Sequence, residues 1–221
     1  MTQPTLPTVS AKPSTKRRAP EVRKQEVLAE AILYFAEEGF DGGTRGLAKR
    51  IGITQPLFYR YFPSKDDLVN EVYRAVYLDR WQDNWEVNLC DDRQPLEARL
   101  LQFYRSYTGV VFERNWLRIY FFAGLKGLDI NARYLQRVES ALLIPIWAQT
   151  CAAFGKSPLS PRTAEQKAHD LVWQMHGAVF YHGIRQQIYG DTSVDIDATI
   201  QLAVKTYLVT AKAALMSDDP N

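Results

Sequence analysis

The 221-residue sequence predicts an all-α protein, and three observations support this fold class. Apolar residues recur at helical spacing in nearly every segment after residue 20, and the alternating pattern of strands is absent. The breaks between these segments contain the Gly, Pro, Asp and Ser residues that end or cap helices. Because 46% of the residues are apolar, the chain can form a dense core without disulfides or a structural metal.

Residues 1–20 predict a disordered basic arm. They are rich in Thr, Pro, Ser and basic residues and have no apolar period. Their prolines argue against an amphipathic targeting helix. Two interpretations stay open for Lys16, Arg17 and Arg18, which could lie along DNA or form a solvated tail.

Charge is distributed unevenly along the chain. Residues 1–65 hold 11 Lys and Arg and 6 Asp and Glu, a net charge of +5, whereas residues 66–221 hold 16 and 19, a net charge of −3. A basic first segment on a slightly acidic remainder suits a protein whose N-terminal part meets phosphate.

Residues 21–66 predict a three-helix DNA-binding domain of the helix-turn-helix type. The first helix, about Glu21 to Glu38, carries an apolar stripe and ends before Gly39. The second begins at Thr44, which we expect to be its N-cap, and ends at Gly52. Thr54 caps the third helix, Pro56 occupies its first turn and Pro63 ends it; Ser64 and Asp67 then form a capping box for a fourth helix.

This arrangement places candidate DNA-contacting side chains on two short helices joined by a tight turn. Gln55 can pair with adenine, and Arg45 can address the O6 and N7 atoms of guanine. Four other residues can reach phosphate oxygens, namely Thr44, Tyr59, Tyr61 and Lys65, and Arg60 can assist them. The tyrosines could instead be packing residues, and Arg60 and Lys65 solvated charges.

The run TRGLAKRIGITQPLFYRYFPSKDDL, from Thr44 to Leu68, resembles the DNA-binding signature of the TetR family of bacterial transcription regulators. The resemblance covers about residues 23–68. It implies that DNA is contacted by Thr44, Arg45, Gln55, Pro56, Tyr59, Tyr61 and Lys65. Leu57 stands where some members carry a small polar base reader, so we expect an apolar contact there, for example with a thymine methyl group. Gly46 also replaces a longer side chain.

Residues 67–221 predict a helical body. The expected helices run from Asp67 to about Asn88, Leu96 to Glu113, Asn115 to Leu125, Ala132 to Phe154, Thr163 to Tyr189 and Ile196 to Met216. Pro145 should kink or divide its helix at Ile144. The resemblance implies that this body binds a small-molecule effector, that the fourth helix links it to the DNA-binding domain, and that the last two helices form a homodimer.

Apolar stripes on these last two helices suit a four-helix dimer interface. One contains Leu171, Met175, Ala178, Val179 and His182, and the other contains Ile200, Val204, Leu208 and Ala211. The alternative, that the stripes form the core within one chain, stays open.

The middle of the chain is crowded with aromatic residues, of which a part could line an effector cavity. We expect Trp116, Tyr120 and Trp147 there. Arg105, Arg118 and His176 could anchor a carboxylate or hydroxyl group of a hydrophobic or aromatic effector.

Two alternatives to an effector-controlled regulator remain. His169, His176 and His182 could make the chain a helical metal-dependent enzyme, but their spacings of seven and six are not those typical of zinc-binding helices. No catalytic triad, phosphate-binding glycine loop or carboxylate pair is evident, so we expect neither an enzyme nor a cofactor. The second alternative is a DNA-binding protein without an effector.

The remaining features indicate a cytoplasmic protein. Cys90 and Cys151 are the only cysteines, lie far apart and suit packing in a reducing compartment. Apolar runs fall short of the roughly 18 residues that span a bilayer, so no membrane partner is expected. The sequence therefore predicts a homodimeric repressor that leaves its operator DNA when an effector binds.

Overall fold

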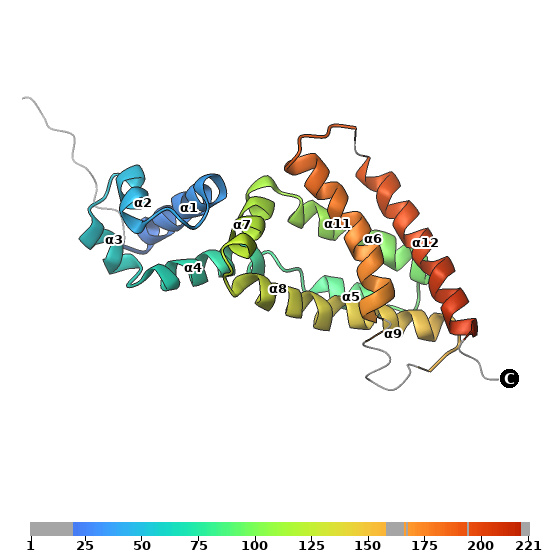
Figure 1. Ribbon diagram of the computed structural model, residues 1–221. Coiled ribbons are helices and arrows are strands. Elements are labelled where there is room, and N and C mark those ends of the chain that lie inside the picture. The colour runs from blue at the N-terminus through green and yellow to red at the C-terminus, as the bar shows by residue number, and fades with distance from the viewer. Residues whose placement is uncertain (1–19, 158–165, 167, 194, 218–221) are drawn as a thin grey trace, which may run out of the picture.

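The computed structural model describes residues 20–157, 166, 168–193 and 195–217. All regular secondary structure in these ranges is helical, which confirms the predicted fold class (Figure 1). The predicted basic arm lies outside the described residues except for Pro20, which is the first residue of α1.

Three helices form one end of the molecule (Figure 1). They are α1 (Pro20–Glu38), α2 (Thr44–Ile51) and α3 (Gln55–Tyr61). Gly39 and Gly52 end the first two with φ angles of +73° and +72°, a left-handed conformation that favours glycine. Buried apolar side chains hold the three helices together, among them Leu28, Phe35, Leu47 and Phe58.

The link to the body is a helix with a wide final turn. α4 (Lys65–Tyr73) continues as the π-helical turn η1 (Arg74–Leu78), and α5 (Asn84–Cys90) follows after a break. The prediction of one helix from Asp67 to about Asn88 is therefore wrong in its middle. Asp79, Asp83 and Asn84 lie at this break, and such short polar side chains compete with helical backbone hydrogen bonds.

The body continues through α6 (Leu96–Val111), α7 (Arg114–Leu125) and α8 (Ile130–Val138). A second π-helical turn, η2 (Glu139–Leu143), then leads into α9 (Ile144–Ala153). The division predicted at Ile144 is where α9 begins. Because Pro145 has no amide hydrogen and crowds the preceding turn, a widened turn directly before it relieves that clash.

The last two helices pack side by side at the end of the molecule farthest from α2 and α3 (Figure 1). The turn η3 (Ala168–Val172) leads into α11 (Trp173–Gln187), and α12 (Ile196–Ser217) follows. The stripes contain five residues that are buried within the chain, so the intramolecular alternative holds for Met175, Val179, Ile200, Val204 and Ala211.

Two further features of the chain bear on its predicted environment. Cys151 is buried as expected, but Cys90 is exposed at the end of α5, so the packing role predicted for Cys90 is wrong. Within the described residues, no helix has both the length and the apolar character needed to cross a membrane.

Candidate DNA-binding site and effector cavity

Three of the predicted DNA-contacting residues meet where α2 and α3 begin. Thr44 is the first residue of α2 and not its N-cap, which is Gly43, so the predicted capping role of Thr44 is wrong. Its hydroxyl lies 3.0 Å from the hydroxyl of Tyr59, and Gln55 Nε2 donates to it across 3.5 Å. The Thr44 side chain thus connects the two helices and orients both neighbours.

The start of α3 is fixed by its cap and leaves its first residues open. Thr54 Oγ1 accepts a hydrogen bond of 3.4 Å from the Leu57 amide, which confirms its predicted role. Pro56 lies in the first turn, where its missing amide hydrogen costs little. Gln55 and Pro56 are exposed and Leu57 is half-buried, so this end of the helix is accessible to a large partner.

Two candidate base readers share one open groove. Arg45 and Gln55 line it together with Lys49, beside the small residues Gly43 and Gly46. A Cβ atom on Gly46 would lie only 2.8 Å from the hydroxyl of Tyr34 on α1. The absence of a side chain at this position therefore lets α2 lie close to α1.

The basic residues near this groove differ in whether their charged groups already bind another part of the chain. Arg45 and Arg60 are exposed and form no ion pair within the described part of the chain, whereas Arg50 pairs with Glu37 at 2.5 Å. Lys65 is half-buried and donates to the Phe40 carbonyl across 2.5 Å. Tyr61 is half-buried and lies beside residues of α1 and α4. Arg45 and Arg60 are therefore the freest of the predicted cations.

A contact between α7 and the end of α1 holds the three-helix end on the body. Arg118 Nε donates to the Ala36 carbonyl, and Arg118 Nη2 donates to the Glu37 carbonyl at 3.2 Å. The guanidinium also lies 5.2 Å from the ring centroid of Phe122, which packs against Gly39. Arg118 is thus engaged with the backbone of α1 and does not point a free charge at an effector.

A cavity of about 80 Å³ lies among α6, α7, α8 and α11. It brings together three of the six predicted effector residues, Trp116, Tyr120 and His176, and Arg118 is not among its lining residues. The others do not line it, since Arg105 is exposed and pairs with Asp197 at 2.6 Å, and Trp147 is buried elsewhere. The remaining lining residues are Tyr107, Tyr134, Leu135, Val138, Trp173, Gly177 and Phe180.

The polar groups of the cavity are uncharged at neutral pH. His176 is 5% exposed, and burial lowers its pKa to about 4. Its Nδ1 atom has no hydrogen-bond partner among the described residues. The hydroxyls of Tyr107 and Tyr134 lie 3.2 Å apart, and burial raises both pKa values.

Seven of the ten lining residues were not predicted from the sequence, among them the aromatic residues Tyr134, Trp173 and Phe180. A signal for two of them was present, because Trp173, His176, Gly177 and Phe180 follow helical spacing and form one stripe on α11.

The two described histidine side chains of α11 lie in different surroundings. His176 lines the aromatic cavity, whereas His182 lines a separate groove between α11 and α12; the side chain of His169 lies outside the described residues. In the part of the chain that is described, no three His, Cys, Asp or Glu side chains come together as a metal site would require. The arrangement gives the metal-enzyme alternative no support.

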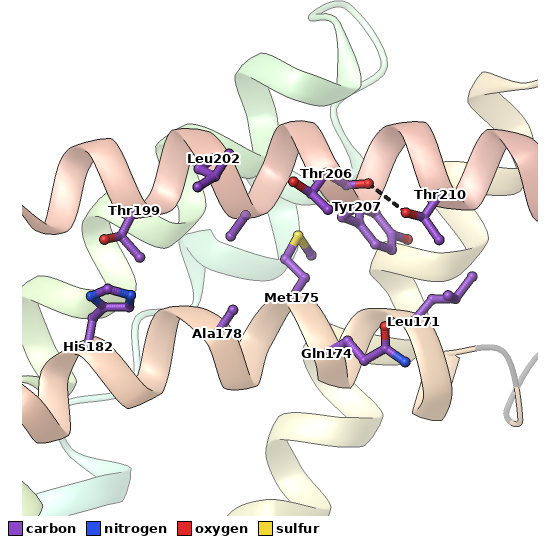
Figure 2. Close-up of a pocket in the computed structure, with 11 residues that line it drawn as sticks. Leu171, Gln174, Met175, Ala178, His182, Thr199, Leu202, Thr206, Tyr207 and Thr210 are labelled. Atoms are coloured by element: carbon purple, nitrogen blue, oxygen red, sulfur yellow. Dashed lines mark hydrogen bonds between the residues drawn. The ribbon is translucent and has the colours of Figure 1, made fainter.

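The groove between α11 and α12 has a volume of about 280 Å³ and opens outward (Figure 2). Ala178 and His182 of α11 face Thr199 of α12 across it, and Leu202 lies on its rim (Figure 2). Leu202 is 67% exposed and Val209, on the same helix, 65% exposed. This face presents apolar side chains that nothing in the described chain covers.

The N-terminal helices match a known protein family. Residues 27–72 match the model of the bacterial regulatory proteins of the tetR family. The chain is 25% identical over 122 residues to the HTH-type transcriptional regulator LuxR of Vibrio harveyi; this match covers 52% of the chain and only 56% of the relative. It is 23% identical over 189 residues to the HTH-type transcriptional regulator BetI of Paraburkholderia phymatum, covering 83% of the chain and 90% of the relative.

A solved structure has the same overall fold. The tetR-family transcriptional regulator from Streptomyces coelicolor superposes with a TM-score of 0.57 at 16% identity, over 92% of each chain. The likeness therefore extends beyond the DNA-binding helices to the arrangement of the body.

Proposed function

Because the chain belongs to the TetR family of bacterial regulatory proteins, we propose that it is a sequence-specific DNA-binding regulator of transcription that acts as a homodimer. The observation that carries this proposal is the open groove that Arg45 and Gln55 share at the start of α3. Guanidinium and amide side chains are the groups that pair with purine edges in the major groove.

We divide the predicted DNA contacts by their surroundings. Arg45 and Gln55 read base edges, and Leu57 makes an apolar contact beside them. Thr44, Pro56 and Tyr59 meet the backbone at the helix starts, and Arg60, Tyr61 and Lys65 supply further contacts with phosphate or sugar. The domain boundaries follow, with DNA binding in residues 21–66 and effector binding and dimerisation in residues 67–221.

Dimerisation places two α3 helices on one DNA molecule. We propose that a second copy covers the groove between α11 and α12, because its rim carries exposed apolar residues such as Leu202 and Val209. Two-fold symmetry then lets the α3 helices enter successive major grooves, which lie roughly 34 to 36 Å apart.

The effector would act through α7. Trp116 and Tyr120 of this helix line the aromatic cavity, while Arg118 and Phe122 of the same helix hold the end of α1. A cytoplasmic effector that displaces α7 would shift the three-helix ends and release the operator, which makes the protein a repressor. Moving such an equilibrium from 1:99 to 99:1 takes about 5.5 kcal/mol of differential binding.

Selection of DNA from a random duplex pool tests the proposed function. The full chain should enrich a sequence of two inverted half-sites whose centres lie about one helical turn apart. Its affinity for that sequence should exceed its affinity for a shuffled one by at least about 10³-fold at matched salt. Enrichment no greater than that of a Gln55→Ala, Arg45→Ala double variant would reject the proposal.

A further inference from the structure

We propose that the aromatic cavity takes a small uncharged aromatic molecule with one hydrogen-bonding group, of the phenol type, and that His176 is its polar partner. This inference rests on the proposed function, because it identifies the kind of effector that the cavity among α6, α7, α8 and α11 would bind.

The shape of the cavity suits a flat ring. Trp116 and Tyr120 are stacked with an interplanar angle of 14°, and His176 and Phe180 are stacked at 13°. The rings of Trp116 and Phe180 meet at 70°, so the walls stand roughly perpendicular to one another. Aromatic rings attract a further ring both by stacking and by edge-to-face contact. A planar aromatic guest can therefore stack on one wall and make edge-to-face contact with the other.

The volume of the cavity is smaller than that of a site known to hold a single aromatic ring. About 80 Å³ is available, whereas an apolar cavity of about 150 Å³ in another protein is known to hold benzene. Entry therefore requires some wall residues to move outward. Tyr120 and Trp173 are half-buried and can move more easily than the fully buried Trp116. Because Tyr120 lies on α7, its displacement would also act on the helix that holds α1.

The lining of the cavity carries no charged side chain. The two arginines that could have met a carboxylate lie elsewhere, since Arg105 pairs with Asp197 and Arg118 bonds to the carbonyls of α1. His176 is neutral at physiological pH because burial lowers its pKa. A charged guest would thus lose its hydration without gaining a counter-charge. The site should discriminate against both carboxylates and ammonium ions.

One buried polar atom in the wall lacks a partner. His176 Nδ1 forms no hydrogen bond within the described chain, although buried polar groups are nearly always hydrogen-bonded. A neutral imidazole has one donor and one acceptor nitrogen, so it can bond a hydroxyl in either direction. Because the His176 side chain lines the cavity, a guest with one hydroxyl that reaches the imidazole would give it a polar partner, whereas a purely apolar guest such as toluene would not.

Binding of four single-ring probes to the full dimeric protein tests the inference. Phenol, toluene, benzoate and protonated benzylamine should be titrated into the protein at pH 7.5 by calorimetry. We expect phenol to bind at least tenfold more tightly than each of the other three. Equal or tighter binding of benzoate or benzylamine, or no saturable binding of phenol, would overturn the proposal.

Variants identify the polar partner. His176→Phe should weaken phenol binding at least tenfold and leave toluene binding unchanged or stronger. Trp147→Phe is the matched control, since Trp147 is equally buried but does not line the cavity, and it should leave both affinities unchanged. Similar losses for phenol and toluene in His176→Phe would contradict a role for His176 as partner.

A spectroscopic measurement covers the case in which His176→Phe does not fold. The ¹⁵N resonances of the His176 ring in the wild-type protein should shift on addition of phenol and stay in place on addition of benzoate. An unchanged ring signal at saturating phenol would refute the proposal. Phenol binding that leaves operator affinity unaltered would instead support the cavity chemistry and reject the effector role in the proposed function.

Discussion

Arg118 offers the sharpest test of how the DNA-binding end is held on the body. Its guanidinium donates to the last carbonyl groups of α1, at Ala36 and Glu37, which lack helical partners of their own. We expect Arg118→Ala to destabilise the fold by about 2 kcal/mol, since each bond from a charged donor to a half-exposed carbonyl contributes about 1 kcal/mol net. Arg118→Lys should recover less than half, because one ammonium group cannot reproduce the two-pronged contact.

The measurement is thermal and urea unfolding at fixed protein concentration. A loss of about 2 kcal/mol should lower the Tm by roughly 4 to 8 °C in a chain of this size. Arg105→Ala is the matched control, because Arg105 forms an exposed ion pair with Asp197, and exposed ion pairs contribute little to stability. Amide exchange should accelerate near the end of α1 and not in α12. An Arg118→Ala variant as stable as Arg105→Ala would refute this account of the contact.

Three further changes have expected outcomes that separate the parts of the structure. Leu202→Glu should convert the dimer into monomers in sedimentation experiments, whereas Leu125→Glu, at a residue even more exposed, should leave the dimer intact. Gly183→Ala should destabilise by about 1 to 3 kcal/mol, because the added Cβ would lie 2.3 Å from an aromatic carbon, whereas Gly109→Ala, with open space, should stabilise by about 0.5 to 1 kcal/mol in chemical denaturation. Burial lowers the pKa of His176 to about 4, below the unfolded value of about 6.5, so stability should fall as pH drops through this window. The loss should approach about 3 kcal/mol near pH 4 and be absent from His176→Phe; an identical pH dependence in both proteins would contradict neutral burial.

The N-terminal helices could be predicted in detail because local signals determine them. Thr54 and Ser64 cap their helices, and Gly39 and Gly52 end theirs, as their types and positions indicate. These effects depend on residues within one turn of one another. The role of Thr44 could not be predicted in this way, since its hydroxyl meets Tyr59, fifteen positions away, and this meeting depends on how α2 and α3 pack.

The residues that line the effector cavity were harder to predict, because the type of a side chain does not show which other residue it will contact in the folded chain. Arg118 and Arg105 have the same side chain, yet one bonds to the backbone of α1 and the other pairs with Asp197, 92 positions along the chain. Two tryptophans differ in the same way: Trp116 lines the cavity, whereas Trp147 is buried in the core and does not line it. Helical spacing identifies which residues share a face, but the packing of four separate helices decides which face encloses the cavity.

The central claim is that the α2 and α3 face reads DNA, and the affinity of Gln55→Ala on two DNA sequences tests it most directly. Fluorescence anisotropy should be measured on the selected operator and on a shuffled duplex at the same salt concentration, with Lys65→Ala as the comparison. We expect Gln55→Ala to lose about 1 to 3 kcal/mol on the operator and almost nothing on the shuffled duplex, while Lys65→Ala weakens both alike. An equal loss from Gln55→Ala on both sequences would contradict the claim.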